Sequence, residues 1–506
     1  MNVGEWPTKW CQLYPDENSV KCSEFDMTRR TFNERVNRLC HAFKERGVVK
    51  GDRVAGLLAN GNVFVETLFS LAKLGAIMVP LNFRLSPPEL SYILDDSEPK
   101  LCLYSPEFAT TVDAVRRSAP SIDSWLCETD GGLAGDAKYE DWTASCSDEE
   151  PDVDTQVGTD DPLFIMYTSG TTGKPKGAIL THGNILWHTI NSVPLYKFGK
   201  DDVVLAVAPL FHIGGLGVSI IPPFYVGCPI VIQRFFIPGE TLQLIEQERV
   251  AFMFGIPVMF QMMCQLPEFE TTDFSSVNFF IAGGSPCSKF LIERYLEKGI
   301  TFNQGYGLTE AAPGVTALRS DTALSKLGSV GKPVFHVTMK IVDAAGKELG
   351  AGEPGEVVVK GPNVMPGYWN LPEETAETLK DGWLHTGDIG YFDQDGYLFL
   401  VDRKKDMYIS GGENVYPAEV EDVILRQENV DDVGVIGVMD EKWGEVGLAV
   451  VVPREGVELT EEEIIEFCEG RLAKYKIPKK VIFVEELPRT ATGKILKKEL
   501  RDLYGN

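Results

Sequence analysis

The stretch YTSGTTGKPKG, from Tyr167 to Gly177, follows an apolar run at 163–166 and combines glycines, hydroxyl side chains and two lysines. Glycine lets a backbone approach a ligand closely. Hydroxyl and backbone N–H groups at such a turn donate hydrogen bonds to phosphate oxygens, and lysines offset the phosphate charge. The stretch is not the common P-loop GxxxxGK[ST], because Pro175 follows Lys174. It therefore predicts a strand that ends in a phosphate-binding loop of another kind.

Short apolar segments alternate with helical patterns after this loop. The strands of parallel sheets are buried on both faces and are joined by helices, so the alternation predicts an α/β fold. We expect a large N-terminal domain of parallel-rich sheets covered by helices. The expected strands lie at 203–209, 229–233, 251–256, 279–282 and 301–304.

The pattern changes from about Val330. Stretches punctuated by glycine and proline, such as GEVVVKGPNV, alternate apolar and polar residues and predict a small antiparallel, barrel-like subdomain. The C-terminal part of the chain predicts a small α+β domain in which Thr460 and Glu463 form a capping box. Its final helix is expected to place Leu496, Leu500 and Leu503 on one face.

Composition restricts the class of protein. A chain of 506 residues predicts several domains. The net charge of −26 argues against a nucleic-acid partner, although a local basic cluster can still bind a small anion. Apolar runs are far shorter than the roughly 20 residues of a membrane span, and the N-terminus predicts no signal peptide. Peripheral membrane contact and a homodimer stay open. Ten cysteines without CxxC pairs favour free thiols and a cytoplasmic location.

Six motifs in a fixed order resemble those of the adenylate-forming enzymes, which include acyl-CoA synthetases, aryl-CoA ligases, luciferases and adenylation domains. The resemblance covers essentially the whole chain. The motifs are YTSGTTGKPKG (Tyr167–Gly177), PLFHIGG (Pro209–Gly215), NQGYGLTE (Asn303–Glu310), GWLHTGD (Gly382–Asp388), DRKKDMYISGGENVYPAEVE (Asp402–Glu421) and PRTATGKI (Pro488–Ile495).

The resemblance implies a reaction in two steps. A carboxylate attacks the α-phosphate of ATP to form an acyl-adenylate and pyrophosphate, and the thiolate of coenzyme A then displaces AMP. A carboxylate is already ionised at pH 7, so the first step needs charge neutralisation and in-line positioning, not a general base. The implied cofactors are ATP, Mg²⁺ and coenzyme A. The implied domains are an adenylation domain at 1–402, a hinge at 403–405 and a mobile C-terminal lid at 406–506.

The resemblance also assigns the nucleotide site. Tyr306 matches the residue that stacks on adenine, Glu310 the carboxylate that holds Mg²⁺, and Asp388 the carboxylate that accepts the ribose hydroxyls. The expected ATP- and AMP-binding residues are Thr168, Ser169, Gly170, Thr171, Thr172, Gly173, Lys176, Gly305, Tyr306, Gly307, Thr309, Asp388, Arg403 and Lys494.

Four residues are expected to be catalytic by the same resemblance. Lys494 matches the lysine that bridges the substrate carboxylate and the α-phosphate, and Lys405 is the hinge about which the C-terminal domain rotates between the two steps. Thr309 matches a hydroxyl that contacts phosphate, and His212 lies beside the acyl pocket. Lys405, Gly411 and Gly412 are expected to line the coenzyme A tunnel.

The expected acyl pocket is short of bulky side chains. It comprises His212, Gly214, Gly215, Gly283, Gly284, Gly307, Leu308, Ala311 and Ala312. No tryptophan follows the TE pair, as it does in acetate-type relatives, and no basic side chain is available there for a second carboxylate. The apolar run FMFGIPVMFQMM would supply methionine walls, although a Met/Phe stretch of this kind is more often ordinary core. Since each buried methylene contributes roughly 0.8 kcal/mol, we expect a medium- or long-chain fatty acid.

Several alternatives stay open at this point. Small pocket residues also admit the ring of a hydroxycinnamate-type acid. The acyl group could pass to an external carrier protein in place of coenzyme A, and luciferase-like oxygenase chemistry shares the same adenylation motifs. A non-catalytic scaffold is disfavoured because Lys494, Asp388, Glu310 and Lys405 are all present.

Overall fold

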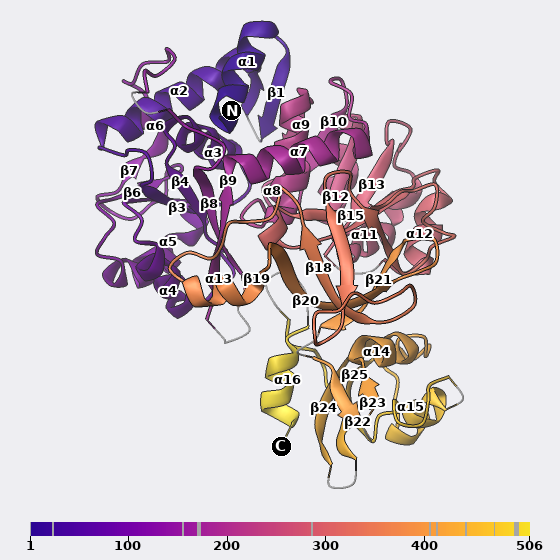
Figure 1. The fold of residues 1–506 in the computed structure, drawn as a ribbon. Helices are drawn as coiled ribbons and strands as arrows, with labels where there is room; N and C mark the ends of the chain where they lie inside the picture. Colours follow the sequence, from indigo (N-terminus) through magenta and orange to yellow (C-terminus); the bar gives the residue numbers. More distant parts are fainter. Residues whose placement is uncertain are drawn as a thin grey trace. The chain divides into compact units, whose positions relative to one another are not determined.

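The computed structural model describes residues 2–22, 25–153, 156–168, 174–284, 287–403, 406–410, 413–440, 443–469, 471–489 and 495–505. The chain divides into two compact units, one formed by Met1–Thr338 and Val359–Leu384 and the other by Met339–Val358 and His385–Asn506 (Figure 1). The second unit thus contains residues that we expected in the adenylation domain. The hinge at 403–405 stays a prediction, since Lys404 and Lys405 lie outside the described residues.

The first unit contains a mainly parallel sheet that ends in the phosphate-loop hairpin. All neighbours in this sheet are parallel except β8 and β9, which are antiparallel. In sheet order the strands are β7 (Ala137–Lys138), β6 (Ser124–Cys127), β5 (Leu101–Tyr104), β3 (Arg53–Leu57), β4 (Ile77–Pro80), β8 (Pro162–Thr168) and β9 (Lys176–Thr181).

Other strands of the first unit contain the five segments expected after the loop. Strands β14 to β11 are parallel neighbours, as predicted, and β15 returns antiparallel to β14. In order the strands are β16 (Ser329–Pro333), β15 (Gly314–Leu318), β14 (Phe302–Gly307), β13 (Phe279–Ala282), β12 (Val250–Gly255), β10 (Val203–Ala206), β11 (Ile230–Ile232), β1 (Asn18–Cys22) and β2 (Phe25–Thr28).

Helices of the first unit are amphipathic or buried according to their sequence. In α2, the Thr28 side chain caps the N-terminus by accepting from the Thr31 N–H, and Phe32, Val36 and Phe43 face the core at helical spacing. The helices are α1 (Trp6–Leu13), α2 (Arg29–Glu45), α3 (Asn62–Leu74), α4 (Pro87–Ser97), α5 (Ala109–Val115), α6 (Tyr139–Thr143), α7 (His182–Tyr196), α8 (Ile213–Ser219), α9 (Ile221–Val226), α10 (Pro238–Gln247), α11 (Pro257–Cys264), α12 (Lys289–Leu296) and α13 (Pro372–Thr378). Short 3-10 turns are η1 (Val3–Glu5), η2 (Pro106–Phe108), η3 (Arg116–Ser118), η4 (Pro267–Glu270) and η5 (Thr309–Ala311).

The second unit is α+β. Its first strands are neighbours in the order β17 (Thr338–Val342), β18 (Gly355–Lys360), β20 (Trp383–Phe392) and β21 (Leu398–Arg403). The two-residue strand β19 (Leu379–Lys380), which lies in the first unit, pairs with the start of β20. A second sheet has the order β23 (Glu413–Val415), β22 (Tyr408–Ser410), β25 (Gly444–Pro453) and β24 (Val430–Asp440), with β26 (Lys480–Phe483) beside β25. Its helices are α14 (Pro417–Ile424), α15 (Glu461–Cys468) and α16 (Lys497–Tyr504).

Two details of this unit test the sequence predictions. The capping box of Thr460 and Glu463 is confirmed at the start of α15. The predicted apolar face of α16 is wrong at one position: Leu500 is fully buried, whereas Leu503 is 60% exposed. The helix starts only at Lys497, and Leu500 packs in a core cluster against which Ile495 and Tyr504 also lie.

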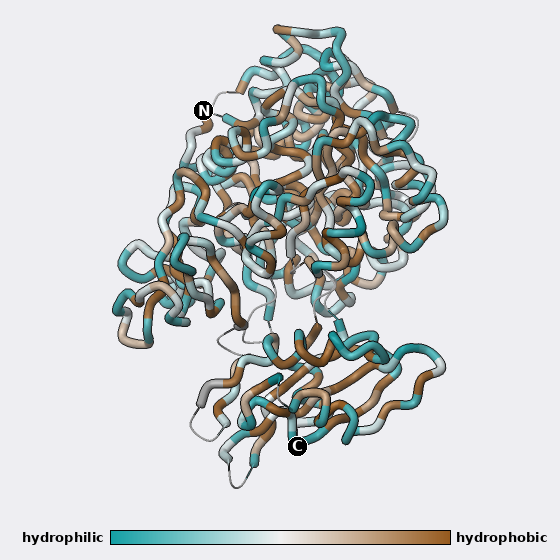
Figure 2. Tube along the Cα trace, turned by 90° about the vertical axis from the view of Figure 1, so that its right-hand side faces the viewer, coloured by the Kyte–Doolittle hydropathy of each residue, from teal (hydrophilic) through white to brown (hydrophobic). Residues whose placement is uncertain are grey.

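Hydrophobic stretches, brown in Figure 2, run through each unit, and hydrophilic stretches lie along its outer loops. Within the described ranges, no helix is long and apolar enough to cross a membrane. All ten cysteines are free thiols, and most of them are buried.

Two histidines of α7 are buried as neutral imidazoles, which predicts an acid-sensitive fold. Burial lowers the pKa of both His182 and His188 to about 4. Because these folded-state pKa values lie below the ordinary 6.5, their stabilisation is complete above pH 6.5 and is lost as the pH falls toward 4. When the pH is lowered from 7 to 5, each of these histidines should lower the free energy of unfolding by about 2 kcal/mol.

Urea unfolding at pH 7 and pH 5 measures this effect. The ring Nε2 of His188 lies 2.7 Å from the Gly217 carbonyl oxygen, and a glutamine amide can donate the same bond without titrating near pH 5. His188→Gln should therefore lose less stability than the parent protein over this interval. An equal loss in both proteins would contradict the assignment.

Candidate active site

The motif YTSGTTGKPKG starts in β8 and ends in β9, and these two strands pair antiparallel. Tyr167 lies opposite Gly177 and Thr168 opposite Lys176, and the Thr168 hydroxyl is 3.4 Å from the Lys176 carbonyl oxygen. Thr168 and Lys176 therefore stand at the two ends of the loop. The intervening residues that we expect to contact phosphate, Ser169, Gly170, Thr171, Thr172 and Gly173, lie outside the described residues.

A segment distant in sequence packs along β9. The Gly367 carbonyl accepts a hydrogen bond from the Ile179 N–H at 3.0 Å, and the Trp369 N–H donates to the Gly177 carbonyl at 2.7 Å. The indole of Trp369 also donates to the Asp96 carbonyl of α4 at 3.1 Å, and Figure 1 shows α13, in orange, beside α4, in purple. These bonds fix Tyr368 beside the base of the loop.

Tyr368 lies between two residues that the motifs place in the ATP site. Its hydroxyl donates to Glu310 Oε1 at 2.8 Å, and Lys176 Nζ lies 5.4 Å from the centre of its ring. Burial, followed by the nearby Glu310 carboxylate, raises the pKa of Tyr368 well above its ordinary value, so the hydroxyl stays a proton donor at neutral pH. Sequence reasoning missed Tyr368. Its only local signal is the GYW triplet at 367–369, which lies outside the six motifs.

Tyr306, Thr309 and Glu310 follow one another at the end of β14. The Tyr306 N–H donates to the Thr316 hydroxyl of β15 at 3.3 Å, and the Met365 N–H donates to the Glu310 carbonyl at 2.9 Å. The first unit thus brings Thr168, Lys176, Tyr306, Thr309 and Glu310 onto ordered elements, with Lys176 and Glu310 joined through Tyr368.

Two glycines of the expected acyl pocket serve close backbone packing. A Cβ atom added to Gly215 would lie 2.3 Å from the Pro209 carbonyl oxygen, and one added to Gly307 would lie 2.2 Å from the Pro313 carbonyl oxygen. Gly305 is similar, with the Thr316 carbonyl oxygen 3.0 Å away. These three positions therefore exclude side chains because main-chain atoms already occupy the space.

Phe254, at the end of β12, fills the space beside two other pocket glycines. A Cβ atom at Gly214 would lie 3.0 Å from His212 Nδ1 and 3.4 Å from Phe254 Cζ, and one at Gly283 would lie 3.0 Å from Phe254 Cε2. The ring is 8% exposed. Phe254 belongs to the run that we expected to supply methionine walls, but Met253, Met259 and Met263 pack instead in a different core cluster, with Phe260 and Tyr295. Residues 253 and 254 point to opposite faces of the strand.

The remaining pocket residues surround this region. His212 is exposed and caps α8, its Nδ1 accepting from the Gly214 N–H at 3.0 Å. Gly284 adopts a positive φ of 85°, with Ile256 Cγ2 3.3 Å from its Cβ position. Leu308 is half-buried, and Ala311 and Ala312 are fully buried.

The second unit holds the expected ribose-binding pair. Asp388 in β20 is buried and lies opposite Arg403 of β21 in the antiparallel pairing, and its N–H donates to the Thr386 hydroxyl at 3.1 Å. Lys405, Gly411, Gly412 and Lys494 lie outside the described residues, so their roles stay predictions.

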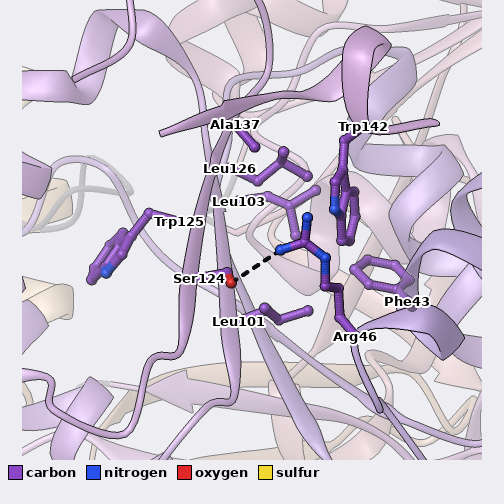
Figure 3. A pocket seen from close by; sticks show the side chains of 9 residues that line it. All are labelled: Phe43, Arg46, Leu101, Leu103, Ser124, Trp125, Leu126, Ala137 and Trp142. Carbon is purple, nitrogen blue, oxygen red and sulfur yellow. Dashed lines mark hydrogen bonds between the residues drawn. The ribbon is translucent and has the colours of Figure 1, made fainter. Parts of the chain in front are cut away.

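A separate apolar hollow lies at the edge of the first sheet described. Figure 3 shows its lining side chains, with Trp142 and Phe43 on one side, Leu101 and Leu103 behind, and the Arg46 guanidinium reaching Ser124 Oγ at 3.5 Å. None of its lining residues belongs to the six motifs.

Comparisons with known proteins all match this chain to AMP-binding enzymes and CoA ligases. The family model for AMP-binding enzymes matches residues 8–369, and the model for the AMP-binding enzyme C-terminal domain matches residues 419–494. A feruloyl-CoA synthase from Amycolatopsis sp is 43% identical over 99% of both chains. The long-chain-fatty-acid–CoA ligase FadD13 from Mycobacterium tuberculosis is 41% identical over 94% of this chain and 93% of its own.

A solved structure is similar over nearly the whole length. The o-succinylbenzoate coenzyme A synthetase MenE from Bacillus subtilis, in complex with ATP and magnesium ion, superposes with a TM-score of 0.87 at 32% identity, over 98% of this chain and 99% of that one.

Proposed function

Because the chain belongs to the AMP-binding enzyme family and is an ATP-dependent acyl-CoA ligase, we propose that it activates an aryl acid of the hydroxycinnamate type. Its substrates are ATP, coenzyme A and a carboxylic acid, and Mg²⁺ is its metal. The observation that carries the choice of acid is the ring of Phe254 against Gly214 and Gly283.

The nucleotide roles follow the motif assignments. Tyr306 stacks on adenine, Thr309 contacts phosphate, and Lys176 with the loop hydroxyls from Thr168 to Thr172 neutralises and orients the phosphates. Asp388 and Arg403 bind the ribose. The roles proposed for the NQGYGLTE motif are supported by the positions of Tyr306, Thr309 and Glu310, which follow one another at the end of β14.

Glu310 fits the metal role. Mg²⁺ that arrives with nucleotide phosphates needs only one or two protein carboxylates. Glu310 offers two oxygens, of which Oε1 already accepts a hydrogen bond that fixes the carboxylate. Glu310 would hold Mg²⁺, and the ion would supply charge neutralisation of the phosphates.

The C-terminal roles are carried by the motifs. Lys494 bridges the substrate carboxylate and the α-phosphate in the first step, Lys405 is the hinge, and Gly411 and Gly412 line the path of the pantetheine arm. The ten free thiols support a cytoplasmic location, where disulfides are rare.

The pocket geometry supports a flat acid. The phenyl ring of Phe254 closes the space that Gly214 and Gly283 leave beside the end of β12. A long alkyl chain needs a pocket that extends beyond the position of the Phe254 ring. An aromatic acid can instead pack its ring against the edge of Phe254 in the geometry that aromatic pairs prefer. The full-length similarity to a feruloyl-CoA synthase agrees with this choice.

A medium- or long-chain fatty acid is the second candidate. The residues after the TE pair, Ala311 and Ala312, are small, and FadD13 is almost as similar as the feruloyl-CoA synthase. The two candidates differ in whether the acyl group packs as a ring against Phe254 or extends as an alkyl chain.

Pyrophosphate release across a panel of acids tests the proposal. With ATP, Mg²⁺ and coenzyme A, 4-coumarate and ferulate should give kcat/KM values at least about tenfold above octanoate and palmitate. Higher turnover with palmitate would overturn the aryl assignment and favour the second candidate. Pyrophosphate release without a thioester product would point to an external carrier as acyl acceptor.

A further inference from the structure

We propose that Tyr368 is a positioning residue of the ATP site, which holds the Glu310 carboxylate through its hydroxyl and the Lys176 ammonium through its ring. This inference rests on the proposed roles of Glu310 and Lys176. It adds a residue outside the six motifs that couples the metal carboxylate to the phosphate loop.

The hydroxyl fixes one oxygen of the metal carboxylate. Tyr368 donates to Glu310 Oε1 at 2.8 Å, and the Met365 N–H holds the backbone of Glu310 at 2.9 Å. A carboxylate has two oxygens, so the bond to Oε1 leaves Glu310 able to hold a cation. Partners of this kind orient metal ligands, and their removal typically costs about 10- to 100-fold in metal affinity or activity.

The ring and a neighbouring acid hold the lysine. Lys176 Nζ lies 5.4 Å from the ring centre and 3.7 Å from Glu374 Oε2, and the lysine side chain is only 14% exposed. A cation over an aromatic face is attracted by its quadrupole. Tyr368 and Glu374 thereby restrict a long side chain that would otherwise lose considerable freedom when it meets a phosphate.

Tyr368 is itself held on both sides. Its backbone bridges to Ala178 of β9, and its N–H donates to the Thr375 hydroxyl of α13 at 2.9 Å. The segment that carries Tyr368 is thus fixed to the strand that carries Lys176. A displacement of the Tyr368 segment would therefore displace β9, and the reverse. The hydrogen bond of the Tyr368 hydroxyl would carry the Glu310 carboxylate along.

Two substitutions separate the two contacts. Tyr368→Phe removes the bond to Glu310 and keeps the ring under Lys176, whereas Tyr368→Leu removes both. ATP binding is measured by titration calorimetry without any acid substrate, with Mg²⁺ and with EDTA. The matched control is Tyr104→Phe, which removes a comparable hydroxyl–carboxylate bond, to Asp136 at 2.7 Å, away from the motifs.

Tyr368→Phe should weaken ATP binding about tenfold with Mg²⁺ and leave binding in EDTA unchanged. Tyr368→Leu should weaken binding under both conditions, and Tyr104→Phe under neither. The inference is overturned if Tyr368→Phe binds ATP like the parent protein, or if it loses equal affinity with and without Mg²⁺. Tyr368→Phe alone decides this if Tyr368→Leu does not fold. A parent protein that fails to bind ATP would instead refute the proposed function.

Discussion

Lys494→Ala should lower the rate of acyl-adenylate formation by about two to three orders of magnitude. A cation that meets the charge developing between the carboxylate and the α-phosphate stabilises the transition state of the first step, and the loss of one such group typically costs that much. The second step, attack of the coenzyme A thiolate on supplied acyl-adenylate, needs no such bridge and should keep most of its rate. Single-turnover assays of the two half-reactions measure both values.

Lys498→Ala is the matched control, because this lysine is exposed in the adjacent helix α16. It should leave both half-reactions near the parent rates. Equal losses of both half-reactions in Lys494→Ala would contradict the bridging role and indicate a general defect of the C-terminal unit.

Phe254→Ala should change the acid preference by about 10- to 100-fold toward longer alkyl chains. Removing the ring opens the space beside Gly214 and Gly283, where each added methylene of a substrate can then be buried. Two substrates that differ by one methylene in an apolar pocket typically differ by about 10- to 200-fold in kcat/KM. The quantity measured is the ratio of kcat/KM for octanoate to that for 4-coumarate.

Phe252→Ala is the control for this change. Phe252 lies two residues earlier on β12, on the same face and in the same core cluster, but is 1% exposed and is not among the nearest neighbours of the Cβ positions of Gly214 and Gly283. Both variants should lose stability, typically about 3–5 kcal/mol for a buried phenylalanine, and only Phe254→Ala should change the ratio. Phe254→Leu provides a milder variant if alanine prevents folding. The role of Phe254 would be refuted if Phe254→Ala and Phe254→Leu, like Phe252→Ala, left the octanoate-to-4-coumarate ratio of kcat/KM unchanged.

The reaction class could be predicted from the sequence because its chemistry resides in contiguous motifs. YTSGTTGKPKG and NQGYGLTE contain glycines, hydroxyls and charges at fixed local spacing, and these spacings need no tertiary information to be recognised. The parallel strands were also predictable, since β10, β11, β12, β13 and β14 are short apolar runs bounded by helical patterns.

The details of the pocket could not be predicted in the same way. The sequence shows that Gly214, Gly215, Gly283 and Gly307 lack side chains, but not what occupies the space. At Gly215 and Gly307 it is main chain, at Gly214 it is the His212 imidazole together with the ring of Phe254, and at Gly283 it is the ring of Phe254. Alternation along β12 decides that Phe254, and not the adjacent Met253, faces these glycines. Met253, Met259 and Met263 of the same run pack in a core cluster, which agrees with the alternative that this stretch is ordinary core.

The sequence by itself determined the family, the two-step chemistry, the cofactors and the positions of the parallel strands along the chain. Only the tertiary structure decided that Tyr368 stands between Lys176 and Glu310, because the three residues belong to segments far apart in the chain. Local sequence patterns show which side chains a segment contains. Contacts between segments depend on how β9, η5 and the segment 367–369 pack, and this packing is set by hydrogen bonds and excluded volume that no single stretch contains.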